Sequence, residues 1–282
     1  MTTLPPSPAI VVRPVKNSRN WQFSLLAWND NEDGDDALVY LTDLNLFYKV
    51  RRIEGITVEG CWNRDDKPSP DWVTVDPYCL KAELLPFLSA QLCDHPELHI
   101  DAEQDFELNC LLRILFDVIG SCRNFSHVSI RHYGPICERF LVSQISSGYV
   151  DSLHLRGQWP FEATILIKAH LKTTKYPSLT LDLKTEIYAD QELVNLIFNK
   201  FVKRELTYLK NLRGKLKVDR SFLEQLGSSD LKRWLSTASD GRETLTWQSS
   251  GTTVLTLTAI FETIRSNTLV TFDICCRYLK NQ

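Results

Sequence analysis

The densest set of potential metal ligands in the sequence is Cys93, His95, His99 and Asp101. Zinc takes thiolate, imidazole and carboxylate ligands in proteins, usually as residue pairs at short, regular spacing. Here Asp94 and Pro96 interrupt that spacing, and no second ligand pair follows. We therefore expect no metal site, but a helix end that runs into a strand whose Leu98 and Ile100 point inward.

An acidic segment, NDNEDGDD at residues 29–36, has part of the pattern of a calcium-binding loop. Its first, third, fifth and sixth positions fit that pattern, but the twelfth position, where calcium loops carry a bidentate Glu, is Tyr40. Because strand-like segments flank it, we interpret the segment as the solvated loop of a β-hairpin.

The strongest local charge lies between residues 200 and 220, where eight basic residues accompany two acidic ones. The basic residues are Lys200, Lys203, Arg204, Lys210, Arg213, Lys215, Lys217 and Arg220. Such a cluster can bind the phosphates of nucleic acid, although a charged outer helix face has the same composition. Since the whole chain has a net charge of −3, nucleic-acid binding would be local to this segment, and we keep it as the alternative function.

Motifs of the common catalytic sites do not occur, because the chain has no GxxxxGK, GxGxxG, GxSxG, HExxH or CxxC. His127, His132, His154 and His170, with scattered serines, could supply a base and a nucleophile, but no spacing selects a pair. We therefore expect a protein that is not an enzyme and needs no cofactor. An enzyme of unknown class is the third hypothesis.

The elements that position these residues show an internal repeat of a strand followed by a helix. At a constant offset of 25, Val128, Ile130, Arg131, Pro135 and Phe140 align with Leu153, Leu155, Arg156, Pro160 and Ile165. In both units the strand is followed by Gly and then by Pro at a plausible first helical turn. A third unit joins the strand PSLTLDLK to a helix capped by Asp190, with a stripe of Leu193, Val194, Ile197, Phe198 and Phe201.

Looser units flank these three: HPELHID with the helix of Leu108 to Ile119 precedes them, and TYLKNLRG follows. Another helix is indicated by Leu80, Leu84, Leu88 and Leu92. Strand centres recur at roughly 25 to 30 residues, within the range of leucine-rich repeats. The fold prediction is α/β, with leucine-rich-repeat-like strand–helix repeats that form a curved parallel sheet and helices on its outer side.

Both ends of the chain have the pattern of antiparallel β structure, which would cap the repeats. Short apolar runs separated by Asn, Asp, Gly and Pro clusters extend from Trp21 to about Val75, and Thr244 to Phe261 predicts two strands and a turn. We expect a β cap at residues 1–75, a repeat region at 76–236 and a second β cap at 237–282, within one continuous domain.

Strand parity predicts a binding surface. If Val128, Ile130, Leu153, Leu155, Leu179 and Leu181 point to the helices, the open face carries Ser129, Arg131, His154, Arg156, Thr180 and Asp182. Repeat proteins present such polar rows to protein partners, and simple solvation explains the row equally well. Arg131 and Arg156 should lie side by side on this face, with Asp182 as the nearest carboxylate.

The sequence also bears on the compartment. The first residues have no apolar core of secretory length, and no stretch is apolar enough to span a bilayer. Eight cysteines without a CxxC pair fit free thiols in a reducing compartment. We expect the cytoplasm, with the nucleus as an alternative, and no membrane partner.

The segments VSIRHYGPICERFL, VDSLHLRGQWP, LTLDLK, LVNLIFNKFVKREL and GRETLTW resemble a lineage-expanded group of nematode proteins labelled F-box or F-box-associated proteins. The likeness runs from about Pro86 to Trp247. It implies an α/β half that holds substrates for a ubiquitin ligase, and a ligase adaptor as a partner of the F-box. Since an F-box is a helical segment and residues 1–75 have a strand pattern, we expect either the recognition half alone or a diverged paralogue that has lost the coupling to the ligase. The leading prediction is a non-enzymatic protein–protein interaction module with an unknown protein partner.

Overall fold

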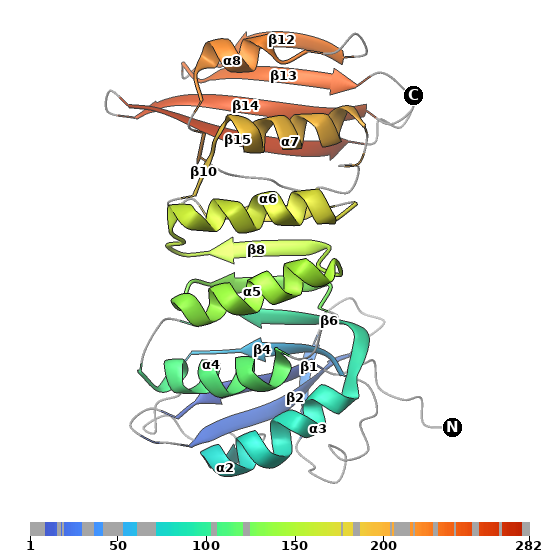
Figure 1. Cartoon of the computed structure of the whole chain (residues 1–282), viewed down its shortest axis with the longest axis vertical. Coiled ribbons are helices and arrows are strands. Elements are labelled where there is room, and N and C mark those ends of the chain that lie inside the picture. The colour runs from blue at the N-terminus through green and yellow to red at the C-terminus, as the bar shows by residue number, and fades with distance from the viewer. Residues whose placement is uncertain are drawn as a thin grey trace. The chain divides into compact units, whose positions relative to one another are not determined.

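A computed structural model describes residues 9–15, 18, 20–29, 37–41, 53–60, 72–102, 106–120, 125–175, 177–182, 187–203, 205, 215–216, 218–227, 231–239, 241–249, 254–264 and 267–277. The chain divides into two compact units, Met1–Tyr149 and Val150–Gln282 (Figure 1). Both are mixed α/β structures, and each is considered by itself.

The first unit contains a mixed sheet in the order β3-β2-β1-β4-β6-β7, with β5 paired to β2. Its strands are β1 (Ala9–Pro14), β2 (Trp21–Asn29), β3 (Ala37–Leu41), β4 (Ile53–Val58), β5 (Val73–Val75), β6 (Leu92–Ile100) and β7 (His127–Arg131). Strands β1, β4, β6 and β7 are parallel, whereas β2 is antiparallel to β1, β3 and β5. The predicted strands before residue 75 are thus confirmed, and β2 and β3 pair on either side of the acidic segment, whose residues 30–36 lie outside the described residues. The parallel pair β1–β4 corrects the purely antiparallel prediction.

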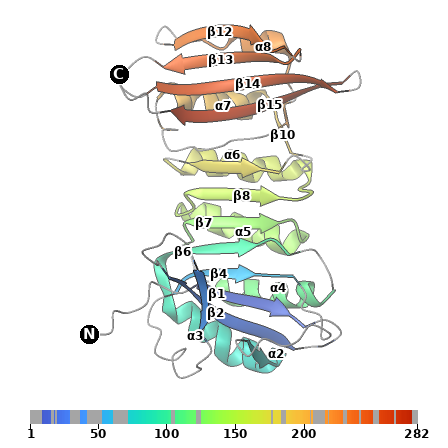
Figure 2. The same cartoon turned by 180° about the vertical axis from the view of Figure 1, so that it is seen from behind.

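The helices of this unit are α2 (Pro77–Cys79), a π-helical turn η1 (Leu80–Leu84), α3 (Leu85–Gln91), α4 (Phe106–Ile119) and α5 (Pro135–Ser147). Helices α3, α4 and α5 lie on one face of the sheet in Figure 1, and Figure 2 shows the opposite face. In the π turn Leu85 N–H bonds to Leu80 O, which brings both Leu84 and Leu85 into the core. The predicted helical stripe is wrong at Leu92, because this residue begins β6 and pairs with Ile53.

The second unit begins with the parallel strands β8 (Ser152–Arg156) and β9 (Ser178–Leu181), joined by a 3₁₀ turn η2 (Phe161–Ala163) and helix α6 (Thr164–Thr173). A six-stranded sheet follows in the order β10-β11-β15-β14-β13-β12. Its strands are β10 (Tyr188–Ala189), β11 (Lys215–Leu216), β12 (Leu231–Thr237), β13 (Glu243–Ser249), β14 (Val254–Ile264) and β15 (Asn267–Arg277), antiparallel except for β10–β11. The predicted strands between Thr244 and Phe261 are confirmed.

Two helices lie against this antiparallel sheet, α7 (Gln191–Val202) and α8 (Arg220–Gln225) (Figure 1). Asp190 caps α7 by accepting a hydrogen bond from Leu193 N, as predicted, and the whole predicted stripe of α7 is buried. Phe198 from that stripe meets Trp247 of β13 edge to face, with ring centroids 5.9 Å apart. The helix of the third sequence unit therefore packs on the carboxy-terminal sheet.

The repeat prediction holds for the strands and fails partly for the helices and the sheet shape. Its six inward strand residues are all buried. Phe140 is buried, but its counterpart Ile165 is 71% exposed, because η2 precedes α6 and the three-residue turn shifts the phase of the helix. The curvature expected of a repeat sheet is not observed in the first unit, where the antiparallel β1-β2-β3 continues the parallel strands (Figure 2). The segment TYLKNLRG lies outside the described residues.

Candidate functional site

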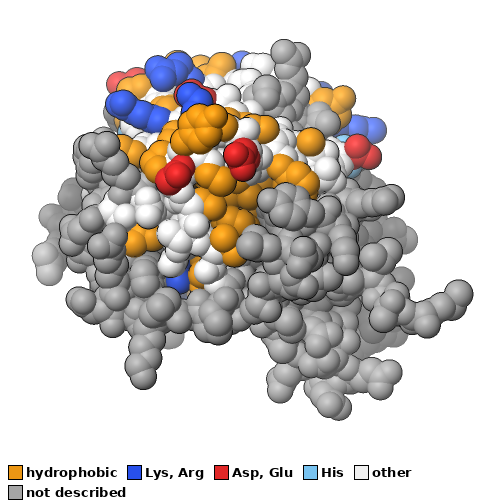
Figure 3. All heavy atoms as spheres, turned by 90° about the horizontal axis from the view of Figure 1, so that it is seen from below, with side chains coloured by type: hydrophobic (Ala, Val, Ile, Leu, Met, Phe, Trp, Pro, Cys, Tyr) orange, Lys and Arg blue, Asp and Glu red, His pale blue; other side chains and the backbone are white. Residues whose placement is uncertain are grey.

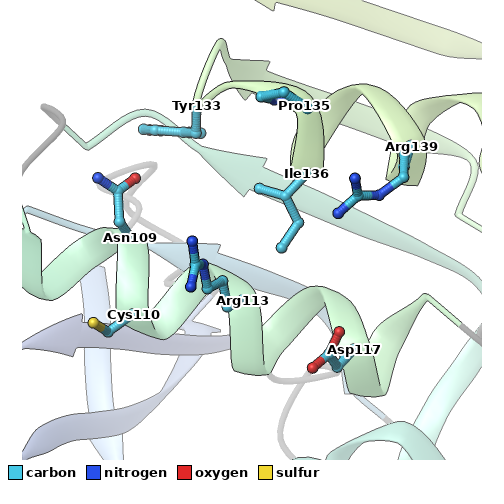
Figure 4. A pocket seen from close by; sticks show the side chains of 8 residues that line it. All are labelled: Asn109, Cys110, Arg113, Asp117, Tyr133, Pro135, Ile136 and Arg139. Atoms are coloured by element: carbon cyan, nitrogen blue, oxygen red, sulfur yellow. The ribbon is translucent and has the colours of Figure 1, made fainter.

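A groove between α4 and α5 in the first unit has a volume of about 780 Å³, within the range of ligand pockets in proteins. It is lined by Asn109, Cys110, Arg113, Asp117, Tyr133, Pro135, Ile136 and Arg139 (Figure 4). Arg113 and Asp117 point from α4 towards α5, whereas Ile136 and Arg139 point from α5 towards α4. Charged and apolar side chains therefore face the same space.

The α4 wall follows from helical spacing. Asn109, Arg113 and Asp117 recur every fourth residue and so lie on one side of the helix. The opposite side is buried and contains Leu108, Leu111, Leu112, Leu115 and Ile119. A stack between Phe116 and Phe140, with ring centroids 4.7 Å apart, joins α4 to α5 beside the groove. The apolar junction thus fixes both helices and leaves the polar side of α4 open.

The α5 wall is held by hydrogen bonds at the start of the helix. Gly134 precedes Pro135 with φ of 83°, a conformation that glycine adopts without strain. Tyr133 N donates to Cys137 Sγ at 3.2 Å, and the thiol donates to Gly134 O at 3.0 Å. Tyr133 Oη donates to Ala102 O at 2.7 Å. Because burial raises the pKa of Cys137 to about 12, this residue is a neutral thiol that positions the turn.

The groove is electropositive. Arg113 and Arg139 are both exposed, and neither forms an ion pair with a carboxylate in the described part of the chain. Asp117 is the one carboxylate among the lining residues, so the lining carries a net charge of +1. The amino terminus of α5, which lacks a side-chain cap, adds a partial positive charge. A ligand with a carboxylate or another anionic group would be favoured here.

A second surface, at the end of the first unit that Figure 3 shows, is apolar. Hydrophobic side chains gather there beside a few charged ones. In α2, η1 and α3, exposed residues recur every fourth position: Tyr78, Ala82, Pro86 and Ala90. This stripe lies next to the exposed Lys81 and Glu83. Its apolar character contrasts with the groove, which combines charge with a concave shape.

The predicted binding face has two members in the first unit. Arg131 is half-buried and pairs with Asp101, with its Nη2 2.9 Å from Oδ1. Ser129 is only 2% exposed, so its assignment to an open face is wrong for the first unit. The adjacent strand explains part of this burial, because β6 places His99 opposite Ser129 and the ring of His99 lies 4.8 Å from that of His127.

The other four members, His154, Arg156, Thr180 and Asp182, are half-buried in the second unit, opposite in parity to the buried leucines. Arg156 Nε donates to His154 Nδ1 at 3.3 Å, and Asp182 Oδ2 accepts from Gly157 N at 3.1 Å. These polar groups therefore support one another within the unit. The predicted adjacency of Arg131 and Arg156 joins residues of two different units and stays a prediction.

The basic segment is less available to phosphate than its composition suggests. Lys200 Nζ donates to Thr174 O at 2.9 Å and pairs with Glu205 at 3.1 Å. Arg220 pairs with Glu224 at 2.7 Å and with Glu243 at 2.5 Å. Lys203 is exposed and Lys215 lies in β11, while Arg204, Lys210, Arg213 and Lys217 are outside the described residues. Two of the predicted phosphate ligands thus serve the fold, which weakens the nucleic-acid alternative.

Two of the histidines near Cys93, which were weighed as metal ligands and rejected, have other contacts. His99 Nε2 lies 3.1 Å from Glu97 Oε2, and His95 lies beside Tyr149 with ring centroids 6.3 Å apart. No group of three or more His, Cys, Asp or Glu among the described residues could hold a metal ion. Leu98 and Ile100 are buried in β6, which confirms the strand interpretation. Within the described ranges, every helix falls short of the length and apolarity that crossing a membrane requires.

The sequence reasoning missed the groove. The polar stripe Asn109, Arg113 and Asp117 on an otherwise apolar helix was a detectable signal for one wall. The opposite wall had no such signal. Arg139 and Ile136 face the groove because the Phe116–Phe140 stack and the turn at Gly134 set the position of α5, and these contacts are not visible in the local sequence.

Comparisons with known proteins give no family for the chain. No family model matches it, and no curated protein and no solved structure is significantly similar to it.

Proposed function

We propose that this chain is a non-enzymatic protein-interaction module that binds an acidic segment of a partner protein in the groove between α4 and α5. The observation that carries the proposal is the pair of exposed guanidinium groups, Arg113 and Arg139, which face the groove without a carboxylate partner in the described part of the chain. Arg forms two parallel hydrogen bonds to a carboxylate, which gives both affinity and geometric specificity.

The remaining lining fits a peptide better than an inorganic anion. Pro135 and Ile136 offer apolar surface next to the arginines, and Asn109 offers an amide that can donate and accept. A volume of about 780 Å³ accommodates several side chains. An acidic residue flanked by apolar ones would therefore use the charge and the apolar wall together.

The same lining argues for binding over catalysis. Its titratable groups are two arginines, one carboxylate, the thiol of Cys110 and the phenol of Tyr133, which already donates to Ala102 O. None of the eight lining residues is a histidine or a lysine, so Cys110 has no adjacent base of the kind that activates a nucleophile.

Fluorescence polarisation with two pools of labelled short peptides tests the proposal, one pool rich in Glu and Leu and a matched pool with Gln in place of Glu. The Glu pool should bind more tightly, and added salt should weaken its binding. The Arg113→Gln/Arg139→Gln double variant should bind the Glu pool at least about tenfold more weakly. Lys81→Gln, which removes an exposed charge of the same unit outside the groove, is the matched control. Equal binding of both pools, or full binding by the double variant, would contradict the proposal.

The resemblance to F-box-associated proteins extends the proposal to substrate recognition for a ubiquitin ligase in the cytoplasm or nucleus, with the strand–helix units forming a leucine-rich-repeat-like series. The recurring strand–helix units and the free cysteines Cys79, Cys93, Cys110 and Cys137 support this extension. The described elements up to Val75 are strands, so the extension concerns substrate binding and does not include adaptor binding. Co-purification of the full chain with a ligase adaptor is the measurement that would restore it.

A further inference from the structure

Strand β12 is the outermost strand of the six-stranded sheet of the second unit. It pairs with β13 along all seven residues without a register shift. In the described part of the chain no strand pairs with its other edge (Figure 1). Six of its seven residues are exposed. An open, regular edge of this kind presents unpaired backbone N–H and C=O groups to another strand.

The two faces of β12 differ. Arg233 belongs to the face that carries α8, because its guanidinium donates to Glu224 O, and its cross-strand neighbour Trp247 donates from Nε1 to Leu226 O. Lys232, Trp234 and Ser236 therefore lie on the opposite face. Trp234 is 42% exposed there, and Leu235 on the helix side is 47% exposed. Proline and a bulge discourage pairing at a sheet edge, and β12 has no proline and no register shift. A charge on the inner face has the same effect, and the one charge on the helix side of β12, Arg233, donates a hydrogen bond to Glu224 O within the unit.

We propose that β12 pairs antiparallel with β12 of a second copy of this chain, with the two-fold axis at Trp234, and so joins two six-stranded sheets into one. A two-fold axis perpendicular to the sheet keeps each face on its own side, so opposed residues share a face and one residue must oppose its own copy. Trp234 is the middle residue of Leu231–Thr237, and it is the only centre that pairs the strand over its full length.

Charge excludes two of the other possible centres. With the axis at Trp234, Lys232 opposes the partner's Ser236, and Arg233 opposes the partner's Leu235. An axis at Lys232 or Arg233 would instead place like charges directly opposite one another, which is unfavourable, and would shorten the pairing.

The Trp234-centred register also creates favourable contacts. The two Trp234 rings oppose each other, and each lies diagonal to the partner's Lys232, a separation that long and aromatic side chains bridge. A lysine ammonium over an indole face is a favourable cation–π pair. Lys232 has no ion pair within the described residues and is available for this contact. An unrelated acidic strand could also use Lys232, but it would gain nothing from the symmetry about Trp234.

Sedimentation equilibrium of the full chain over a range of concentrations tests the proposal with two variants and their mixture. Trp234→Lys and Trp234→Glu each place like charges at the axis and should weaken self-association at least about tenfold. An equimolar mixture should form a heterodimer, because the axis then brings Lys opposite Glu. Circular dichroism of each variant confirms folding, since the side chain is exposed. A parent chain that stays monomeric, or variants that dimerise like the parent, would overturn the proposal.

Cysteine cross-linking locates the axis. Trp234→Cys places two thiols opposite each other, about 4.5 to 5.5 Å apart at Cα, within disulfide range. In Lys232→Cys the two thiols would be separated by four residues along the strands, about 13 Å. Oxidation should cross-link the first variant and not the second, with the parent chain as the control for its native cysteines. A dimer whose Trp234→Cys form does not cross-link uses another surface and refutes this register.

Discussion

Two helix junctions differ in whether their cationic side chains form ion pairs. One is the junction of α4 and α5 in the first unit, and the other is the junction of α6 and α7 in the second. Between α6 and α7, Lys168 Nζ lies 2.8 Å from Asp190 Oδ2 and 2.6 Å from Glu192 Oε2, and Lys172 also pairs with Glu192. These hydrogen bonds raise the pKa of Lys168. Between α4 and α5 an aromatic stack joins the helices and the arginines stay unpaired within the described residues. Cations in the second junction hold the fold, whereas those in the first have no ion pair within the described residues and are the ones we propose for ligand binding.

The largest expected effect comes from the aromatic stack. Phe140 is 4% exposed and contacts Phe116 and Phe125, so Phe140→Ala should lower the free energy of unfolding by about 3 to 5 kcal/mol. Ile165→Ala, the aligned position of the other repeat unit, should change it by less than about 0.5 kcal/mol because that side chain is exposed. Urea denaturation measures both. Equal losses of unfolding free energy in the two variants would mean that the aligned positions of the two helices are equally buried.

The difference between Phe140 and Ile165 also shows which parts of the fold could be predicted from the sequence. Inward strand positions such as Val128 and Leu153 were predictable, because a strand alternates its faces and burial follows residue type. The cap at Asp190 was predictable for a similar local reason. The helix phase after η2 was not, because a single 3₁₀ turn rotates every later residue and leaves no clear mark in the composition.

The candidate site was less predictable than the fold, because it depends on pairing across long sequence separations. Arg131 looked free on its strand, but Asp101, thirty residues earlier, lies within 2.9 Å of it. Lys200 looked like a phosphate ligand, but Thr174 O and Glu205 engage its ammonium. Arg113 and Arg139 had the same residue type, and only the structure separates them from the arginines and lysines with partners.

The second-largest effect concerns pH and the second unit. His170 is fully buried, with Nε2 3.3 Å from Ser178 O and Nδ1 3.2 Å from the hydroxyl of Thr174. Burial, with Lys200 nearby, lowers its pKa to about 4. Between that value and the ordinary value of 6.5, the unfolded chain binds more protons than the folded one, so stability falls as pH falls through this window.

We expect His170 to reduce the free energy of unfolding by about 2 kcal/mol between pH 7 and pH 5. Urea denaturation of the parent chain and of His170→Gln at both pH values measures this contribution, since the variant keeps the other titrating groups. A variant with the same pH dependence as the parent would show that the His170 ring is protonated in the folded state at pH 5.

A smaller effect is expected at the charged junction itself. Burial alone would raise the pKa of Asp190, but hydrogen bonds from Lys168 and from Leu193 N outweigh it and hold the pKa below its usual value. Asp190→Ala removes both the helix cap and the ion pair, and should cost about 1 to 2 kcal/mol. Asp190→Asn keeps an oxygen for the cap and should lose about half as much. If Asn and Ala were equivalent in thermal denaturation, the cap would contribute nothing.

The smallest effect on stability is expected for substitutions of the two groove arginines, which should have the largest effect on the proposed peptide binding. Arg113 and Arg139 are exposed and have no ion pair in the described residues, so Arg113→Gln and Arg139→Gln should each change the free energy of unfolding by less than about 0.5 kcal/mol. Lys168→Gln is the matched change in the other junction and should destabilise more, since it leaves Asp190 without its lysine partner. Thermal denaturation of the three variants compares them directly. A large loss of thermal stability in either arginine variant would mean that these guanidinium groups hold α4 against α5, which would contradict a role limited to ligand binding.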